Sequence, residues 1–117
     1  MVVRKTILVI ESDHETRVSI RRALEDAGHF VISATNGADA LSLLEKMSLP
    51  SIILLDASIP LMNGEQFLAV LRSDPERSSI PVVQISGPGE ARLEGAFCSI
   101  TKPLTSAAIL KVVENCK

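Results

Sequence analysis

Four side chains that could take part in chemistry lie at or just after the ends of short apolar runs in this sequence. The runs cover residues 6–10, 52–55, 81–85 and 98–100, and the side chains are Glu11, Asp56, Ser86 and Lys102. In a parallel sheet the carboxyl ends of the strands meet at one edge, and functional groups gather just beyond them. If these runs are strands, two carboxylates, a hydroxyl and an ammonium group converge at that edge.

This combination of groups favours phosphoryl transfer. Clustered carboxylates repel one another and need a cation, and oxygen ligands with room for water favour Mg²⁺. An aspartate beside such a cation can attack a phosphoryl group as a nucleophile, which makes Asp56 the candidate acceptor. Lys102 and the Ser86 hydroxyl can then neutralise the oxygens of the transferred group. Pro103 makes a cis peptide bond after Lys102 accessible, and its rigidity fixes where the lysine points.

The apolar runs and the segments between them predict a three-layer α/β architecture. A fifth run covers residues 30–34, and the unbroken run at 52–55 is typical of a strand buried on both faces. Apolar residues recur at helical spacing over residues 16–27, 37–47, 64–72 and from 106 onwards. Strand and helix thus alternate along the chain, which predicts a parallel sheet covered by helices on both faces.

Two details of the helices are predicted from particular residues. Ser12 begins a Ser-Asp-His-Glu sequence, which predicts a capping box with Ser12 as the N-cap of the first helix. After Ser86, Pro88 and its flanking glycines delay any helix, and Gly95 ends it. We therefore expect a shortened fourth helix of one or two turns over residues 89–94.

Composition restricts the classes of function open to the chain. Its 117 residues fit one domain, residues 1–117, and 46% are hydrophobic, with 3 Phe and no Trp or Tyr, so we expect an aliphatic core. The net charge is −2, whereas a domain that binds nucleic acid or an anionic membrane usually has an excess of basic residues, so we expect neither activity. No apolar run has the length of a signal-peptide core or a membrane span, so we expect a cytoplasmic protein.

Several residues with potential redox, metal or docking chemistry receive simpler interpretations. Cys98 and Cys116 have no CxxC spacing and no neighbouring metal ligand, so we expect free thiols in a reducing compartment. His14 and His29 lie outside the apolar runs and are expected to face solvent. Arg17, with the arginines at positions 21 and 22, is interpreted as part of a solvated helix face.

Residues 7–11, 54–56, 59–64, 86 and 102–103 together resemble the receiver domains of bacterial response regulators, and the resemblance covers the whole chain. It implies a three-layer flavodoxin-like (βα)5 fold whose central five-stranded parallel sheet has the strand order 2-1-3-4-5. It also implies a histidine kinase or phosphotransfer protein as phosphoryl donor and a downstream protein target. The roles that it implies are Asp56 as phosphoacceptor, Ser86 as switch hydroxyl, Lys102 as phosphate-binding lysine, Glu11, Asp56 and the Ser58 backbone carbonyl as Mg²⁺ ligands, and Gly64 and Pro103 as structural residues.

Three positions depart from the family pattern. Ser12 stands where receiver domains usually have a second acidic residue, so we expect Mg²⁺ to bind weakly, with Ser12 a poor ligand or one acting through water. Asp13 is expected to face the helix start or solvent. Ser99 stands in place of an aromatic residue whose rotamer reports activation, and the segment from Ser86 to Lys102 is short. Any conformational change is therefore expected in the loops at residues 57–64 and 86–89.

The leading hypothesis is a phosphoacceptor domain that takes a phosphoryl group from a phosphohistidine, with no enzymatic activity beyond self-phosphorylation and slow dephosphorylation. One alternative is a degenerate receiver that acts as a phosphorylation-independent interaction module, which Ser12 and Ser99 motivate. Another is a phosphatase of the haloacid-dehalogenase type, although Ser58 occupies the position where such an enzyme needs a second aspartate. In the simplest interpretation, Asp56 only makes a turn with Ser58, and Ser86 is only a turn hydroxyl.

Overall fold

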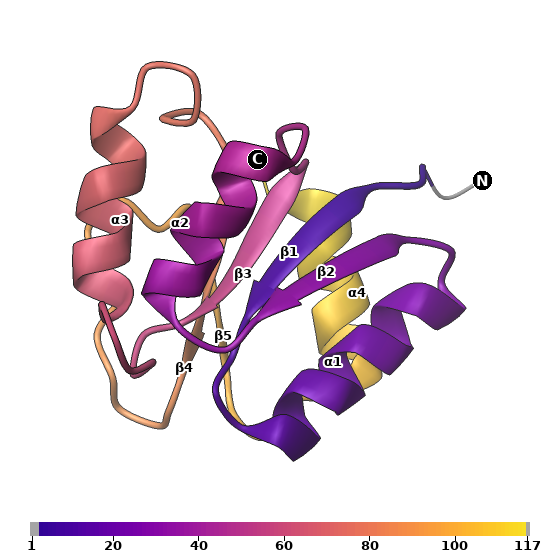
Figure 1. The fold of residues 1–117 in the computed structure, drawn as a ribbon. Helices are drawn as coiled ribbons and strands as arrows, with labels where there is room; N and C mark the ends of the chain where they lie inside the picture. Colours follow the sequence, from indigo (N-terminus) through magenta and orange to yellow (C-terminus); the bar gives the residue numbers. More distant parts are fainter. Residues whose placement is uncertain (1–2, 117) are drawn as a thin grey trace.

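The computed structural model describes residues 3–116 and contains a parallel sheet between two layers of helices (Figure 1). The strands are β1 (Thr6–Ile10), β2 (Phe30–Ala34), β3 (Ile52–Asp56), β4 (Val82–Ser86) and β5 (Cys98–Thr101). The helices are α1 (His14–Asp26), α2 (Gly37–Lys46), α3 (Gly64–Ser73) and α4 (Ser106–Asn115). The strands lie in the order β2-β1-β3-β4-β5, all parallel, which confirms the predicted fold class and strand order.

The core consists of two apolar layers, one on each face of the sheet. Leu8 and Ile10 of β1 face the layer covered by α2 and α3, whereas Ile7 and Val9 face the layer covered by α1 and α4 (Figure 1). All five residues of β3 and all five of β4 are buried. This pattern is typical of central strands in a parallel sheet and explains the unbroken apolar run of β3.

Helix α1 is capped by Asp13, and the prediction that Ser12 caps it is wrong by one residue. The Asp13 carboxylate accepts hydrogen bonds from the Thr16 backbone N–H at 2.9 Å and from the Thr16 hydroxyl at 2.6 Å. Aspartate and serine are equally good N-caps, so their adjacent positions could not be separated by propensity. The expectation that Asp13 faces the start of the helix is confirmed.

The segment between β4 and β5 contains no helix, so the predicted short helix over residues 89–94 is wrong. Side chains satisfy the backbone instead. Gln84 donates from Nε2 to the Ala91 carbonyl at 3.1 Å and accepts the Leu93 N–H at 2.6 Å. Arg72 donates from Nε and Nη2 to the Gly95 carbonyl at 3.1 and 2.7 Å, and its guanidinium lies 4.7 Å from the centre of the Phe97 ring. Long side chains on β4 and α3 thus supply hydrogen-bond partners for part-buried peptide groups of this segment.

Cys98 and Cys116 form a disulfide, so the expectation of free thiols is wrong. Helix α4 runs back along β5, which brings the end of the helix to the start of the strand, with 6.1 Å between the two Cα atoms. A separation of 18 residues in sequence does not show this proximity.

The two histidines differ from each other in exposure. His14 is exposed, as expected, and its Nδ1 lies 3.1 Å from Arg17 Nη2. The expectation for His29 is wrong, because its side chain is buried and its Nδ1 accepts the Lys5 N–H at 3.0 Å. Burial lowers the pKa of His29, and the positive charge of Lys5 lowers it further.

Candidate functional site

The predicted acidic and basic groups meet at the carboxyl edge of the sheet. Lys102, just after β5, places its Nζ 3.0 Å from Asp56 Oδ2, at the end of β3. The same Nζ lies 3.3 Å from Oε1 of Glu11, just after β1. Glu11 and Asp56 are buried, whereas 35% of the Lys102 side chain is exposed. Two carboxylates and one ammonium group therefore form a compact site that solvent reaches from the lysine side.

Asp56 is oriented by the residue two positions further on. Its Oδ1 accepts hydrogen bonds from the Ser58 backbone N–H at 2.9 Å and from the Ser58 hydroxyl at 2.8 Å. The turn proposed as the simplest interpretation is therefore present, and it positions the carboxylate for the contact with Lys102. The Ser58 side chain is engaged with Asp56, so the predicted contribution of Ser58 to a cation rests on its backbone carbonyl.

Gly64, at the first position of α3, lies against the loop that follows Asp56. Its N–H donates to the Ala57 carbonyl at 3.1 Å. A Cβ atom at position 64 would lie 2.7 Å from the Ala57 Cα, which is too close for any other residue without a shift of the backbone. Glycine thus allows the start of α3 to approach the acidic site closely.

Two consecutive residues in the loop after Asp56 have left-handed backbone conformations. Leu61 has φ 48° and Met62 has φ 78°, values that non-glycine residues rarely adopt. The Leu61 carbonyl accepts the Ala38 N–H at 3.0 Å, and a Cβ at Gly37 would lie 2.3 Å from the Met62 carbonyl oxygen. The start of α2 therefore holds a strained loop beside the site.

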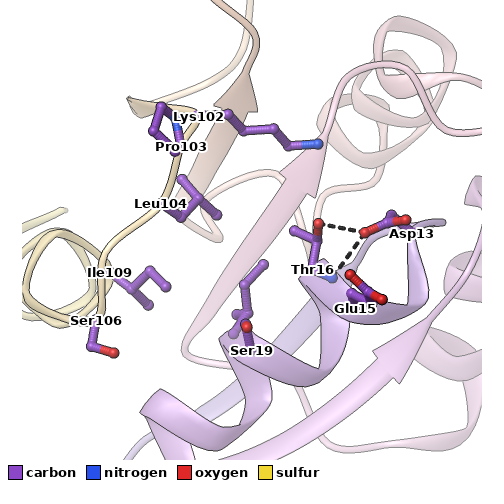
Figure 2. Close-up of a pocket in the computed structure, with 10 residues that line it drawn as sticks. Asp13, Glu15, Thr16, Ser19, Lys102, Pro103, Leu104, Ser106 and Ile109 are labelled. Atoms are coloured by element: carbon purple, nitrogen blue, oxygen red, sulfur yellow. Dashed lines mark hydrogen bonds between the residues drawn. The ribbon is translucent and has the colours of Figure 1, made fainter.

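Ser86 and Pro103 border Lys102. Ser86 is buried at the end of β4, and its carbonyl accepts the Lys102 N–H at 2.8 Å. The Lys102–Pro103 peptide bond is cis. Lys102 and Pro103 line one wall of a pocket of about 360 Å³, and Asp13, Thr16 and other α1 residues line the opposite wall (Figure 2). The pocket offers space next to the lysine, and neither Glu11 nor Asp56 lines it.

The loop between β1 and α1 is held by a residue that the sequence analysis left on a solvated face. Arg17 donates from Nη1 to the Glu11 carbonyl at 3.0 Å and to the Ser12 carbonyl at 3.3 Å. The Asp13 N–H lies 3.3 Å from Glu11 Oε2 and donates to it. The Asp13 carboxylate is turned away to cap α1, so it does not replace the acidic residue missing at position 12. In the sequence, only the position of Arg17, one turn into α1, indicated that its side chain could reach this loop.

The two carboxyl groups respond differently to their shared environment. Burial, together with the neighbouring Asp56, raises the pKa of Glu11 to about 7 against the opposing effects of Asp13 and Lys102. Burial also acts to raise the pKa of Asp56, but hydrogen bonds from Glu11, Ser58 and Lys102 outweigh it and hold the pKa below its usual value. Asp56 is thus ionised at neutral pH, whereas a fraction of the Glu11 side chains is protonated at neutral pH.

The oxygen atoms of the Glu11 and Asp56 carboxylates and of the Ser58 backbone carbonyl fit one hard divalent cation. Glu11 Oε1 is buried and receives no hydrogen bond from residues 3–116, and Lys102 approaches it at 3.3 Å without hydrogen-bond geometry. With both carboxylates ionised, Lys102 neutralises one of the two negative charges. Over these same residues, no cluster of three or more His, Cys, Asp or Glu side chains could hold a metal. A cation bound here would keep several waters, as Mg²⁺ does.

A doubly wound parallel sheet with this acidic and lysine-bearing edge matches the arrangement that the sequence analysis expects of a receiver domain. The family model of the response regulator receiver domain matches residues 7–114, and the chain belongs to that family. It is therefore a receiver domain, a phosphoacceptor module of two-component signalling, and a signalling module rather than a classical enzyme. Membership of this family does not favour the degenerate alternative.

Relatives of similar length agree with this assignment, and solved structures agree with the fold. The chain is 32% identical to a 14.6 kDa protein from the sodA1 3′ region of Leptolyngbya boryana, covering 93% of this chain and 87% of that protein. It is 29% identical to PilH of Pseudomonas aeruginosa, covering 92% and 93%. A putative response regulator from Chloroflexus aurantiacus has a TM-score of 0.89 at 23% identity, covering 97% of both chains. The chemotaxis regulator CheY4 of Vibrio cholerae has a TM-score of 0.87 at 22% identity, covering 95% and 97%, and these two structures support the fold alone.

No helix in residues 3–116 has the length and apolar character needed to cross a bilayer.

Proposed function

We propose that Asp56 is the phosphoryl acceptor of this receiver domain and that the donor is a phosphohistidine on a histidine kinase or phosphotransfer protein. The observation that carries the proposal is the 3.0 Å contact between Lys102 Nζ and the ionised Asp56 carboxylate. A buried carboxylate with a fixed orientation and an adjacent cationic group suits nucleophilic attack on a phosphoryl group.

In the proposed reaction an Asp56 oxygen forms a bond to phosphorus while the bond from phosphorus to the donor's histidine nitrogen breaks. Ser58 holds the carboxylate in place through two hydrogen bonds to Oδ1. Lys102 neutralises charge on the oxygens of the transferred group, and the Ser86 hydroxyl donates a hydrogen bond to one of them. Self-phosphorylation from small donors and slow dephosphorylation are the full extent of the chemistry that we assign to the domain.

The cation proposed for this reaction is a weakly bound Mg²⁺. Receiver domains generally bind Mg²⁺ at their acidic phosphorylation site, and here Glu11, Asp56 and the Ser58 carbonyl would hold it, with Ser12 a weak ligand or one acting through water. When bound, the ion would neutralise charge on the two carboxylates and on the phosphoryl oxygens. Weak affinity follows from Ser12, because a neutral hydroxyl replaces a carboxylate ligand.

We further propose that the response is confined to the loops at residues 57–64 and 86–89 and is passed to a downstream protein target in the cytoplasm. The left-handed backbone at Leu61 and Met62 supports this, because a strained loop beside the site has an alternative to relax into. Ser99 is exposed on β5 and has no ring with which to report a change. Spectral changes after phosphorylation that spread over β5 and α4 would contradict this part of the proposal.

Phosphorylation is tested by incubating the protein with Mg²⁺ and acetyl phosphate and measuring its intact mass. We expect a gain of one phosphoryl group that is lost in Asp56→Asn. The matched control is Asp13→Asn, which removes a nearby carboxylate but keeps a good N-cap, and it should be modified like the wild type. No adduct with acetyl phosphate, phosphoramidate or a phosphorylated phosphotransfer protein would overturn the proposal and favour an interaction module.

A further inference from the structure

We propose that the Cys98–Cys116 disulfide is a reversible redox site, which a dithiol reductant opens in the folded domain. The bond joins the first residue of β5 to the C-cap of α4. It closes a covalent ring that contains the whole of β5, Lys102 and the whole of α4. The inference stands independently of phosphoryl transfer.

The disulfide is open to solvent on one side. Both cysteines line a surface pocket of about 390 Å³ together with Ile100, Val112 and Lys111. Cys98 is half-buried, whereas Cys116 is 4% exposed and packs with Ile109 and Val113. A reductant thiolate can therefore approach the Cys98 sulfur through the pocket, and the cationic Lys111 in the same wall favours thiolate chemistry.

The exchange is balanced by the reductant. A thiolate of the dithiol attacks the Cys98 Sγ, the bond between the two cysteine sulfurs breaks, and Cys116 leaves as a thiolate that takes up a proton. The second thiol of the reductant then attacks the mixed disulfide and releases Cys98, which also becomes a thiol. The protein gains two electrons and two protons, and the reductant becomes a disulfide.

The ring joins an edge strand to the last helix of the described chain. β5 is an edge strand of four residues, paired with β4 alone, and its burial is partial at Cys98 and Ile100. Near its C-terminal end, α4 is also held by Lys5, which donates from Nζ to the Val113 carbonyl at 2.7 Å, and by the buried Val113 side chain. These contacts keep α4 docked after reduction, while the end of α4 and the start of β5 lose their covalent link.

The test uses the folded protein in buffers of dithiothreitol or oxidised glutathione without denaturant, followed by alkylation with iodoacetamide and intact-mass measurement. We expect no label in the oxidised protein, a label on each cysteine after reduction, and no label in protein that is reduced and then reoxidised before alkylation. The melting temperature should fall by on the order of 10 °C on reduction, because the unfolded chain regains the freedom of an open loop. Hydrogen exchange should rise more within residues 98–116 than in β1 and β3, where exchange follows the global stability of the domain.

The matched control is the double variant Cys98→Ser/Cys116→Ser. Its melting temperature should not respond to reductant and should lie near that of the reduced wild type. If the variant folds poorly, the reduced wild-type protein provides the second measurement. A bond that is reduced only after the domain has been unfolded would overturn the proposal, as would two labelled cysteines in the oxidising buffer. Unchanged exchange across residues 98–116 after full reduction would also overturn it.

Discussion

Lys102 Nζ contacts Asp56 Oδ2 at 3.0 Å, although the two residues are 46 positions apart and their strands are not neighbours in the sheet. β4 lies between β3 and β5, so the lysine side chain reaches across the end of β4, where Ser86 accepts the Lys102 N–H at 2.8 Å. The long lysine side chain thus brings a positive charge to the buried Asp56 from a strand that is not adjacent to β3. The contact underlies the first prediction.

Replacing Lys102 by alanine should slow phosphorylation of Asp56 by acetyl phosphate on the order of 100-fold, because a positioned cation that neutralises developing charge is lost. Lys102→Arg should restore part of the rate, since charge is retained but the guanidinium has a different shape. The measurement is the time course of the phosphorylated mass. Lys111→Ala, an exposed lysine on α4, is the matched control and should react at the wild-type rate. Equal rates for Lys102→Ala and the wild type would refute the assigned role.

Replacing Ser12 by aspartate should tighten Mg²⁺ binding about tenfold or more, because a third carboxylate joins Glu11 and Asp56 at the site. Calorimetric titration with MgCl₂ measures the affinity, which suits a chain with no Trp and no Tyr. Ser42→Asp places the same charge on an exposed position of α2 and should leave the affinity unchanged. If both variants bind Mg²⁺ like the wild type, position 12 is not part of the cation site.

The buried His29 should make stability fall as the pH is lowered. Burial lowers its pKa in the folded state, so below the unfolded value of 6.5 the unfolded chain binds a proton that the folded chain does not. This contribution is fully present above pH 6.5 and is lost as the pH falls towards the folded pKa, with a slope of at most about 1.4 kcal/mol per pH unit.

Urea denaturation of the wild type and of His29→Gln isolates this effect from the other titrating groups. The measurements are made at about pH 5, 6 and 7, the range in which histidine changes charge. The difference in unfolding free energy between the two proteins should shift in favour of the variant as the pH falls. A difference that stays constant with pH would show that His29 titrates alike in both states.

Replacing Arg72 by alanine should destabilise the domain by about 2–4 kcal/mol, because its guanidinium donates to the carbonyls of Gly95, Ser78 and Ile80. The Gly95 carbonyl would lose its partner in the part-buried segment that replaces the fourth helix, and the Ser78 and Ile80 carbonyls would lose theirs in the loop before β4. Arg92→Ala, which removes an exposed arginine of the same segment, should cost less than about 0.5 kcal/mol. Similar urea midpoints for the two variants would mean that Arg72 does not hold the segment.

The sequence alone determined the five strands and the four helices, and it determined that Glu11, Asp56 and Lys102 lie at or just after strand ends. These properties depend on side-chain periodicity and on the rule that the carboxyl ends of parallel strands share an edge, both of which are local or general. The strand order required the resemblance to receiver domains, because nothing local in the chain specifies which strands are neighbours.

The tertiary structure alone decided the absence of the fourth helix, the disulfide and the burial of His29. Gln84 and Arg72 satisfy the backbone of residues 91–95 from other elements, so the propensity of that segment could not predict its conformation. Cys98 and Cys116 meet because α4 returns along β5, and the buried His29 accepts its hydrogen bond from the Lys5 N–H, 24 residues away. In each case the deciding partner is distant in sequence, and folding brings it close.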